Sequence, residues 1–144
     1  EDKMIPIRFT GYWTGKKTLA EQREYVMHLI RSGRKDQTTR KPSPNYLNMK
    51  VGDDLHLLWG KRGTPGESII ETSCINKYWI RMDVQEKKIY FLGKDPDSMG
   101  MALSPAQVTH FALRDINDTP KRLFEVFETG SYIVVQWPSP KTEI

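Results

Sequence analysis

The middle of the chain is a succession of short strand patterns joined by tight turns, and this succession limits the fold more than any other feature. Leu55, Leu57 and Trp59 alternate directly after the turn Val51-Gly52-Asp53-Asp54, as residues do in a strand with one buried face. Further strand patterns follow at residues 68–75, 77–84 and 89–92. Short turns join antiparallel neighbours, whereas parallel strands need a long crossover. The region therefore predicts antiparallel hairpins rather than repeated βαβ units.

Capping boxes mark one helix before these strands and another after them. In Thr18-Leu19-Ala20-Glu21 and in Ser104-Pro105-Ala106-Gln107 a hydroxyl residue precedes Glu or Gln by three positions, a pattern that satisfies backbone N–H groups of a first helical turn. Gly33 is the expected end of the first helix, and Asp118-Thr119-Pro120 predicts a short third helix. Apolar runs at residues 4–9 and 132–137 add a first and a last strand, and we expect the strongly apolar last strand in the interior of a sheet. The two prolines of Lys41-Pro42-Ser43-Pro44-Asn45 predict a loop. Together these patterns predict an α+β fold, a mixed β-barrel of about six strands with flanking helices.

Length, charge and cysteine content bound the class of protein. A chain of 144 residues predicts a single domain over residues 1–144, with an ordered core over about 4–137. Its 22 basic and 18 acidic residues give a net charge of +4, which favours a polyanionic partner without requiring one. Cys74 is the single cysteine, so no disulfide forms within the chain. No apolar run approaches the ~20 residues that span a bilayer, and the first residues lack a signal-peptide pattern. We therefore expect a cytoplasmic protein that is not held in a membrane.

The stretch Gly33–Lys41 is the strongest candidate for a binding surface. It combines the charged residues Arg34, Lys35, Asp36, Arg40 and Lys41 with the polar residues Gln37, Thr38 and Thr39. Because it has no apolar residue, we expect it to lie outside the core and to line a cleft for an anionic or nucleotide-like partner. The loop 61–66 adds Lys61 and Arg62. Its glycines could hold a phosphate, although a plain turn explains them more simply.

The order of these elements resembles the ASCH domain (activating-signal-cointegrator homology), a branch of the PUA-like superfamily. Gly33, Lys35, Thr38 and Arg40 stand at the spacing of the family signature Gly-x-Lys-x-x-Thr/Glu-x-Arg, and the Val-Gly-Asp turn at 51–53 follows as it does in the family. Family members carry a later acidic residue, often in Asp-Gly-Phe. Asp115 stands near that place, without the Gly-Phe. The resemblance covers roughly residues 4–137.

The resemblance implies a pseudo-barrel whose cleft holds RNA or a nucleoside. Relatives include RNA-binding modules, a small bacterial amidohydrolase acting on acetylcytidine, and a reported nuclease. Carried over by position, the catalytic residues implied here are Lys35, Thr38 and Asp115. The amidohydrolase uses Glu where this chain has Asp115, and a side chain shorter by one methylene changes a geometry on which catalysis depends.

Two functions follow from these residues, and binding is the one we favour. In a binding module, phosphates contact the basic side chains and an unpaired base stacks on Tyr12, Trp13 or Trp59, at about 1–3 kcal/mol per base. The phosphate contacts would be Arg34, Lys35, Arg40, Lys41, Lys61 and Arg62, beside Thr38. For Trp13 and Tyr12, which lie between Gly11 and Gly15, we favour a lid over the core. A solvated basic loop and core-packed aromatics are the simplest alternative explanation of the same residues.

The second function is hydrolysis of an amide on a modified nucleoside. Thr38 would be the nucleophile, and Lys35 the base if burial lowers its pKa. Asp115 would orient the lysine or protonate the leaving amine.

Other classes find little support. The three histidines and one cysteine show no ligand spacing, so we expect no metal site. No Walker loop, nucleophile elbow or dinucleotide fingerprint occurs, and we expect no cofactor. A pure protein-interaction role stays open, and it predicts an exposed apolar patch without nucleic-acid affinity.

Overall fold

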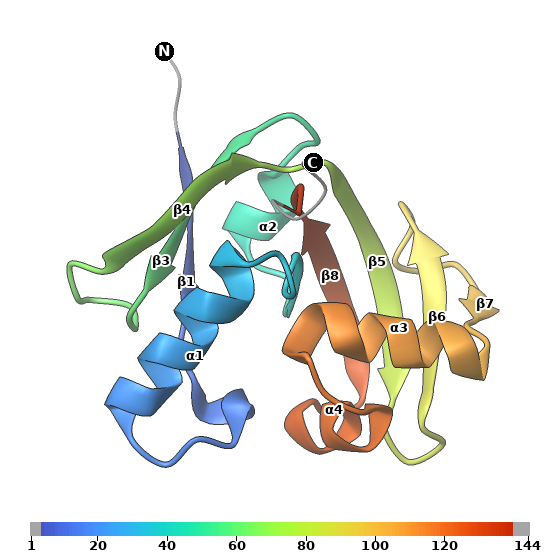
Figure 1. Ribbon diagram of the computed structural model, residues 1–144. Helices are drawn as coiled ribbons and strands as arrows, with labels where there is room; N and C mark the ends of the chain where they lie inside the picture. The colour runs from blue at the N-terminus through green and yellow to red at the C-terminus, as the bar shows by residue number, and fades with distance from the viewer. Residues whose placement is uncertain (1–3, 140–144) are drawn as a thin grey trace.

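The chain folds into two sheets with helices beside them (Figure 1), in a computed structural model that describes residues 4–139. Over these residues one sheet has three strands in the order β1-β3-β4, and the other has five in the order β2-β8-β5-β6-β7. Helix α1 (Leu19–Arg31) lies beside the smaller sheet, while α3 (Pro105–Ile116) and α4 (Pro120–Val126) lie over one face of the larger sheet. The predicted α+β class is confirmed.

The smaller sheet mixes a hairpin with a crossover. Strand β3 (Asp54–Trp59) pairs antiparallel with β4 (Glu67–Ser73) through the loop 60–66, as the strand patterns predict. Strand β1 (Ile5–Phe9) instead pairs in parallel with β3. This pairing requires a long crossover, which is supplied by η1 (Tyr12–Thr14), α1 and the chain up to β3. The hairpin pattern of the sequence does not predict it.

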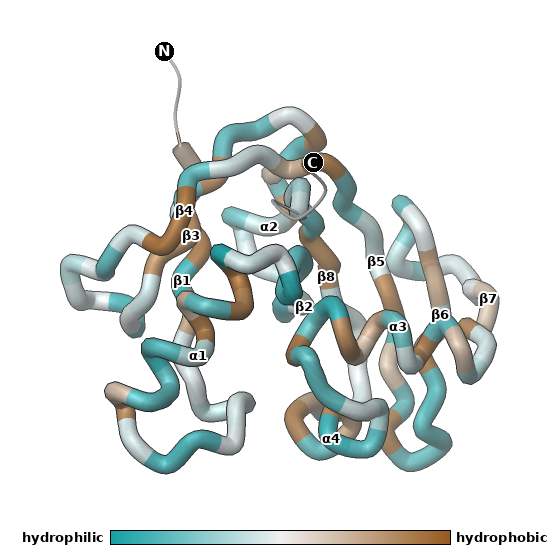
Figure 2. The backbone as a smooth tube through the Cα atoms, viewed as in Figure 1, coloured by the Kyte–Doolittle hydropathy of each residue, from teal (hydrophilic) through white to brown (hydrophobic). Residues whose placement is uncertain are grey.

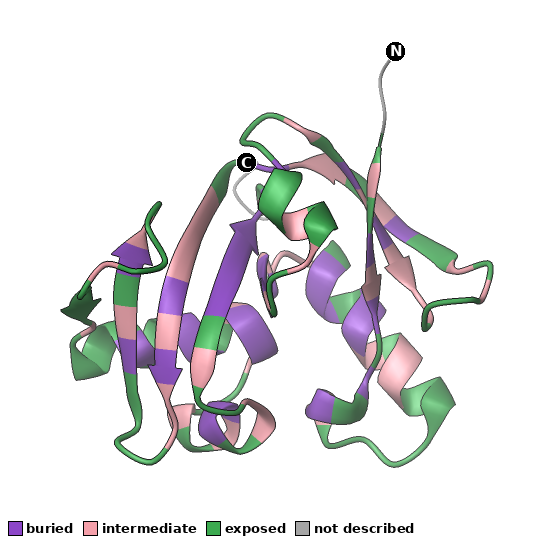
Figure 3. Ribbon diagram, turned by 180° about the vertical axis from the view of Figure 1, so that it is seen from behind, coloured by how far each residue is buried: buried purple, intermediate pink, exposed green. Residues whose placement is uncertain are grey.

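The larger sheet is antiparallel at every pairing. Its strands are β2 (Gln37–Arg40), β5 (Asn76–Asp83), β6 (Lys88–Gly93), β7 (Met101–Ala102) and β8 (Gly130–Gln136). Strand β8 lies between β2 and β5, and residues 132–137 are all buried (Figure 3). Figure 2 shows the corresponding hydrophobic segment of the chain. The interior position expected of this apolar strand is therefore found.

Two expectations about the elements need correction. The described residues hold eight strands in two sheets rather than about six strands, and neither sheet closes on itself as a barrel. The proline-containing segment after β2, expected to be loop, contains the short helix α2 (Pro44–Asn48). Pro44 occupies its first turn, where a missing backbone N–H costs no helical hydrogen bond.

The helix ends follow the sequence closely. Thr18 and Ser104 each accept a hydrogen bond from the backbone N–H three residues on, and both capping boxes are complete. Gly33 follows the last residues of α1 with a φ of 82°, a left-handed conformation that glycine adopts without steric cost. Asn117 ends α3 with a φ of 55°. Asp115 lies in the last turn of that helix and accepts a hydrogen bond from Thr39 of the larger sheet.

Candidate functional site

The polar stretch Gly33–Lys41 is exposed at Arg34 and Lys41, but its middle does not lie outside the core. Its middle is β2, an edge strand that pairs with β8 on one side. Lys35, Gln37, Thr38 and Thr39 are only 3%, 1%, 4% and 6% exposed. Buried polar side chains are stable only if they have hydrogen-bond partners. The buried side chains of β2 find these partners within the strand and on α3.

Along β2, the backbone groups of successive residues point alternately toward β8 and toward the open edge of the sheet. The backbone N–H of Trp137 donates to the carbonyl of Asp36, so residues 36, 38 and 40 are the ones that exchange backbone hydrogen bonds with β8. The backbone groups of Gln37 and Thr39 therefore point to the open edge of the sheet. Side chains alternate as well: those of Gln37 and Thr39 both bond to Asp115, whereas those of Thr38 and Arg40 bond to each other.

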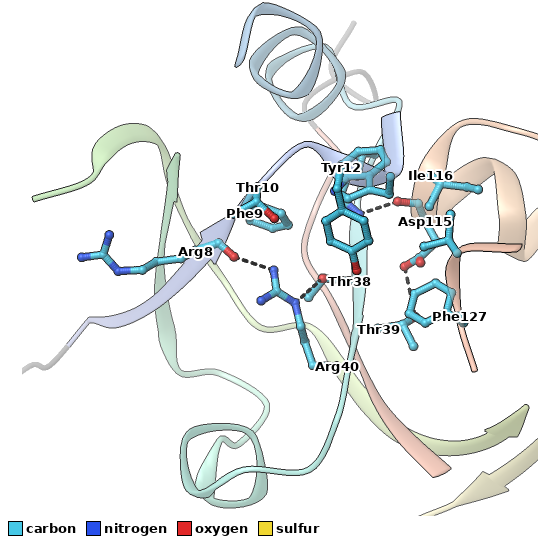
Figure 4. A pocket seen from close by; sticks show the side chains of 13 residues that line it. Arg8, Phe9, Thr10, Tyr12, Thr38, Thr39, Arg40, Asp115, Ile116 and Phe127 are labelled. Carbon is cyan, nitrogen blue, oxygen red and sulfur yellow. Dashed lines mark hydrogen bonds between the residues drawn. The ribbon is translucent and has the colours of Figure 1, made fainter. Parts of the chain in front are cut away.

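A cavity of about 130 Å³ opens at this edge (Figure 4). Its walls are the end of β1, η1, β2, the last turn of α3 and the segment where α4 ends. Polar or charged lining side chains are Arg8, Thr10, Lys35, Thr38, Thr39, Arg40 and Asp115. The cavity therefore combines hydroxyl, carboxyl and cationic groups within a space comparable to the ~150 Å³ cavity that holds one benzene ring.

Lys35 lies at the inner wall of the cavity. Its Nζ donates to the backbone carbonyl of Gln37 at 2.8 Å and to the backbone carbonyl of Asp115. The ammonium also lies 5.1 Å from the ring centroid of Trp13 and 5.5 Å from that of Phe9, within the range of cation–π attraction. Burial lowers the pKa of Lys35 to about 8, and the nearby Asp115 opposes this change. Lys35 thus ties β2 to the end of α3.

Asp115 faces Lys35 from the last turn of α3. Its Oδ1 accepts hydrogen bonds from Thr39 Oγ1 at 3.1 Å and from Gln37 Nε2 at 3.4 Å. Burial raises the pKa of the Asp115 carboxyl, while the charge of Lys35 and these hydrogen bonds counteract part of the rise. The carboxyl therefore keeps its proton to a higher pH than an exposed aspartate does.

Thr38 and Arg40 form the opposite wall. Arg40 Nε donates to Thr38 Oγ1 at 2.8 Å, and Arg40 Nη2 donates to the backbone carbonyl of Arg8 at 2.7 Å. The Thr38 oxygen is thus occupied as an acceptor, and its O–H is the group left to donate. Both hydrogen bonds described for Lys35 Nζ end on backbone carbonyls rather than on Thr38. The hydroxyl and the amine share one cavity without contacting each other as a nucleophile and its base do.

The aromatic residues divide between core and surface. Trp13 is 8% exposed and packs in the core, as the lid interpretation predicts, while its neighbour Tyr12 is 70% exposed. In the view of Figure 4 the Tyr12 ring lies between Arg40 and Asp115. Trp59 packs against the core from β3, opposite Phe9, and does not line the cavity. Trp13, Phe9 and Phe127 also line the cavity, and Tyr12 is the most exposed of these four rings.

The remaining basic candidates lie in three places. Lys61 and Arg62 line a neighbouring groove of about 510 Å³, together with Arg8 and Arg40. Arg34 lines a separate depression beside α3. Lys41 is exposed directly after β2. The structure thus brings Lys35, Thr38, Arg40 and Asp115 to one cavity, with Lys61 and Arg62 next to it, and leaves Arg34, Lys41 and Trp59 outside it.

Sequence reasoning assigned no individual role to seven residues that line the cavity: Arg8, Phe9, Thr10, Thr39, Ile116, Val126 and Phe127. Thr39 is next to a residue that was singled out, and an alternating strand pattern over residues 37–40 would have indicated its inward direction. Arg8 and Phe127 carry no local signal, because their positions depend on how β1 and the end of α4 pack. Within residues 4–139 no group of three or more His, Cys, Asp or Glu side chains could hold a metal ion. Among the helices described there, none is both long and apolar enough to cross a membrane.

Comparison with known proteins adds no relative to this picture: no family model, curated protein or solved structure matches the chain. The cavity presents an exposed ring, a hydroxyl and a carboxyl that can exchange hydrogen bonds, and the guanidinium group of Arg40 at one side. These groups suit a planar polar ring that is attached to an anionic group.

Proposed function

We propose that this protein binds RNA or a nucleotide, holding one unpaired base in the cavity at the edge of β2. The observation that carries the proposal is the convergence of Tyr12, Thr39, Asp115 and Arg40 on one cavity of about 130 Å³. Single-stranded RNA is commonly read in this way, by stacking on an aromatic side chain and hydrogen bonding along a base edge. The size of the cavity favours a single six-membered ring, as in a pyrimidine, over a fused purine.

Each group has a role in this proposal. Tyr12 stacks on the base. The Asp115 carboxyl and the edge-facing backbone groups of Thr39 meet donors and acceptors of the base, and Arg40 supplies positive charge toward its phosphate. Support for an ASCH domain of the PUA-like superfamily comes from the signature at Gly33, Lys35, Thr38 and Arg40, three of which line the cavity. A cytoplasmic location fits Cys74, which is a buried free thiol.

Binding of a fluorescent single-stranded oligouridine, measured by anisotropy over a salt series, tests the proposal. We expect affinity that falls with salt, because phosphate contacts release counterions. Tyr12→Ala should weaken binding roughly 5- to 150-fold, which corresponds to a stacking contribution of about 1–3 kcal/mol. Phe91→Ala is the matched control, since Phe91 is also an exposed ring (45%) but lies on β6, away from the cavity. Absence of binding by the wild type at low salt would contradict the proposal.

A second candidate is amide hydrolysis on a modified nucleoside such as acetylcytidine. It is favoured by one observation: Lys35, with a pKa lowered to about 8, lines the same cavity as Thr38 and Asp115. Lys35 would have to lose a proton and move into contact with Thr38 before it could accept the Thr38 proton, and for that reason binding ranks first. Thr38→Ala should abolish release of the acyl group while RNA binding persists, and Thr38→Ser should retain part of the activity. Hydrolysis that survives Thr38→Ala would exclude this mechanism.

A further inference from the structure

A basic groove lies directly beside the cavity. The two share Arg8, Thr10 and Arg40 as lining residues. Beyond them the groove continues between α2 and the β3–β4 loop, where it adds Tyr46, Lys61 and Arg62. A ligand held in the cavity therefore has the groove directly beside it, with Arg8, Thr10 and Arg40 in common.

The charge of this groove is uncompensated among the residues that line it. Four of the ten lining residues are Lys or Arg, and none is Asp or Glu. Within residues 4–139 none of these cations takes part in an ion pair. The depression that contains Arg34 differs, because there Arg114 Nε lies 2.7 Å from Asp36 Oδ1. An anion gains more from the unpaired cations of the groove than from the neutralised pair.

A continuous series of hydrogen bonds connects the cavity to the loop. Arg40 bonds to Thr38 inside the cavity and to the backbone of Arg8. The Arg8 guanidinium points away from the cavity (Figure 4) and donates to the carbonyl of Lys61 at 3.3 Å and to Thr64 Oγ1 at 3.5 Å. Gly66 makes room for it: a Cβ there would lie 2.9 Å from Arg8 Nη1, and its φ is 78°. Arg8 thereby positions the loop that carries Lys61 and Arg62.

From this arrangement we infer that the groove is a phosphate subsite, so that the ligand of the cavity is a phosphorylated nucleotide or an RNA strand rather than a free base or nucleoside. Its phosphates leave the cavity toward Lys61 and Arg62, and not toward Arg34. The inference rests on the proposed function, since the base occupies the cavity described above. Lys61 and Arg62 contact phosphate oxygens in it, and Arg8 is a positioning residue.

Two double variants with equal loss of charge test the direction of the phosphates. Lys61→Ala/Arg62→Ala removes the exposed cations of the groove, and Arg34→Ala/Lys41→Ala removes two cations outside it. With oligouridine, we expect the groove variant to weaken binding and to reduce the slope of log K against log salt by about 1.4, because each phosphate contact to a single strand contributes about 0.7. The control variant should keep the wild-type slope. Circular dichroism and thermal unfolding establish that both variants are folded.

Competition against the labelled RNA tests the ligand class. Uridine 3′- and 5′-monophosphate and a short unlabelled oligouridine should displace it better than uridine, and this advantage should disappear in the groove variant. Competition by mononucleotides indicates a free nucleotide, and competition by the strand alone indicates an RNA backbone; both support a phosphate subsite. Equal competition by uridine, or equal slope losses in both double variants, would overturn the inference while the proposed function stands. No binding of any ligand by the wild type would refute the proposed function itself.

Discussion

Replacement of Lys35 by Met provides a direct test of the charge buried beneath the cavity. Lys35 is 3% exposed, and burial lowers its pKa to about 8. Met keeps an unbranched side chain of similar length but has no charge. The substitution also removes the donor to the carbonyls of Gln37 and Asp115. Their lost hydrogen bonds lower stability by an amount that changes little with pH, on the order of 1–3 kcal/mol for each carbonyl left unsatisfied.

The pH dependence of the free energy of unfolding distinguishes the wild type from Lys35→Met. Between the folded pKa of about 8 and the ordinary value of 10.5, the unfolded chain holds a proton on Lys35 that the folded chain has released. The free energy of unfolding of the wild type therefore rises with pH through this window. At about 1.36 kcal/mol per pKa unit the full gain is about 3 kcal/mol, and roughly 2 kcal/mol of it is reached by pH 9.5.

Urea unfolding of both proteins at intervals from pH 7 to pH 10 measures this difference. We expect the wild type to gain roughly 2 kcal/mol relative to Lys35→Met by pH 9.5, a shift of about 1 M in the relative urea midpoints for an m-value near 2 kcal/mol/M. Lys94→Met removes the same charge from an exposed turn, and it reports the effect of net charge alone. Parallel curves for wild type and Lys35→Met would refute the reasoning, because Lys35 would then not titrate differently in the two states.

Substitutions at three further positions test the framework around the site. Ser104→Ala removes the hydroxyl that accepts a hydrogen bond from the Gln107 backbone N–H at 3.2 Å. It should lower the free energy of unfolding, measured with urea, by about 1 kcal/mol. An unchanged urea midpoint would show that the cap does not contribute to stability. Asn117→Gly and Asn117→Ala both lose the 3.3 Å hydrogen bond to Tyr25. Because residue 117 has a left-handed φ of 55°, which glycine adopts more easily than alanine, the Ala variant should be less stable than the Gly variant by about 1 kcal/mol. Equal melting temperatures of the two variants would contradict this. Burial raises the pKa of Tyr78 to about 12, so the unfolded chain loses its phenol proton first and the free energy of unfolding should fall by about 2 kcal/mol between pH 10 and pH 12. Tyr78→Phe should remove that fall, and a fall of the same size in the variant would assign it to other groups.

Local signals predicted the helix ends and the hairpins well. The capping boxes at Thr18 and Ser104 and the stop at Gly33 are all present. The turn between β5 and β6 joins antiparallel neighbours as expected. Each of these features depends on contacts between residues three or four apart, and such contacts can be identified from composition and spacing alone.

The burial of β2 was not predictable in the same way. Its residues are polar, and polarity alone indicates a solvated loop. They are buried because Asp115 and Gln136, some 80 to 100 positions away in the chain, supply their hydrogen-bond partners. The parallel pairing of β1 with β3 is similar, since it joins Ile5 to Leu55 across the whole helical crossover. The residues next to β2 and β1 in the sequence do not indicate which distant segments these strands contact.

The candidate site combines both kinds of information. The signature at residues 33–40 identified Lys35, Thr38 and Arg40, and the structure brings Asp115 to the same cavity. Tyr12 rather than Trp59 is the ring at its mouth, because η1 turns Tyr12 outward while β3 packs Trp59 against the core. Lys61 and Arg62 come close to Arg40 because the Arg8 side chain positions their loop.

By itself, the sequence determined the capped starts of α1 and α3, the hairpins, the apolar interior strand and the residue types available for chemistry, since these depend on neighbours along the chain. The tertiary structure alone decided which polar residues are buried, which cations remain unpaired and which ring faces the cavity. The physical reason is that desolvation and charge compensation are set by groups that fold against a residue from distant parts of the chain. Lys35 shows this most clearly: its identity is visible in the signature, but its lowered pKa exists only because α3, η1 and β1 enclose it.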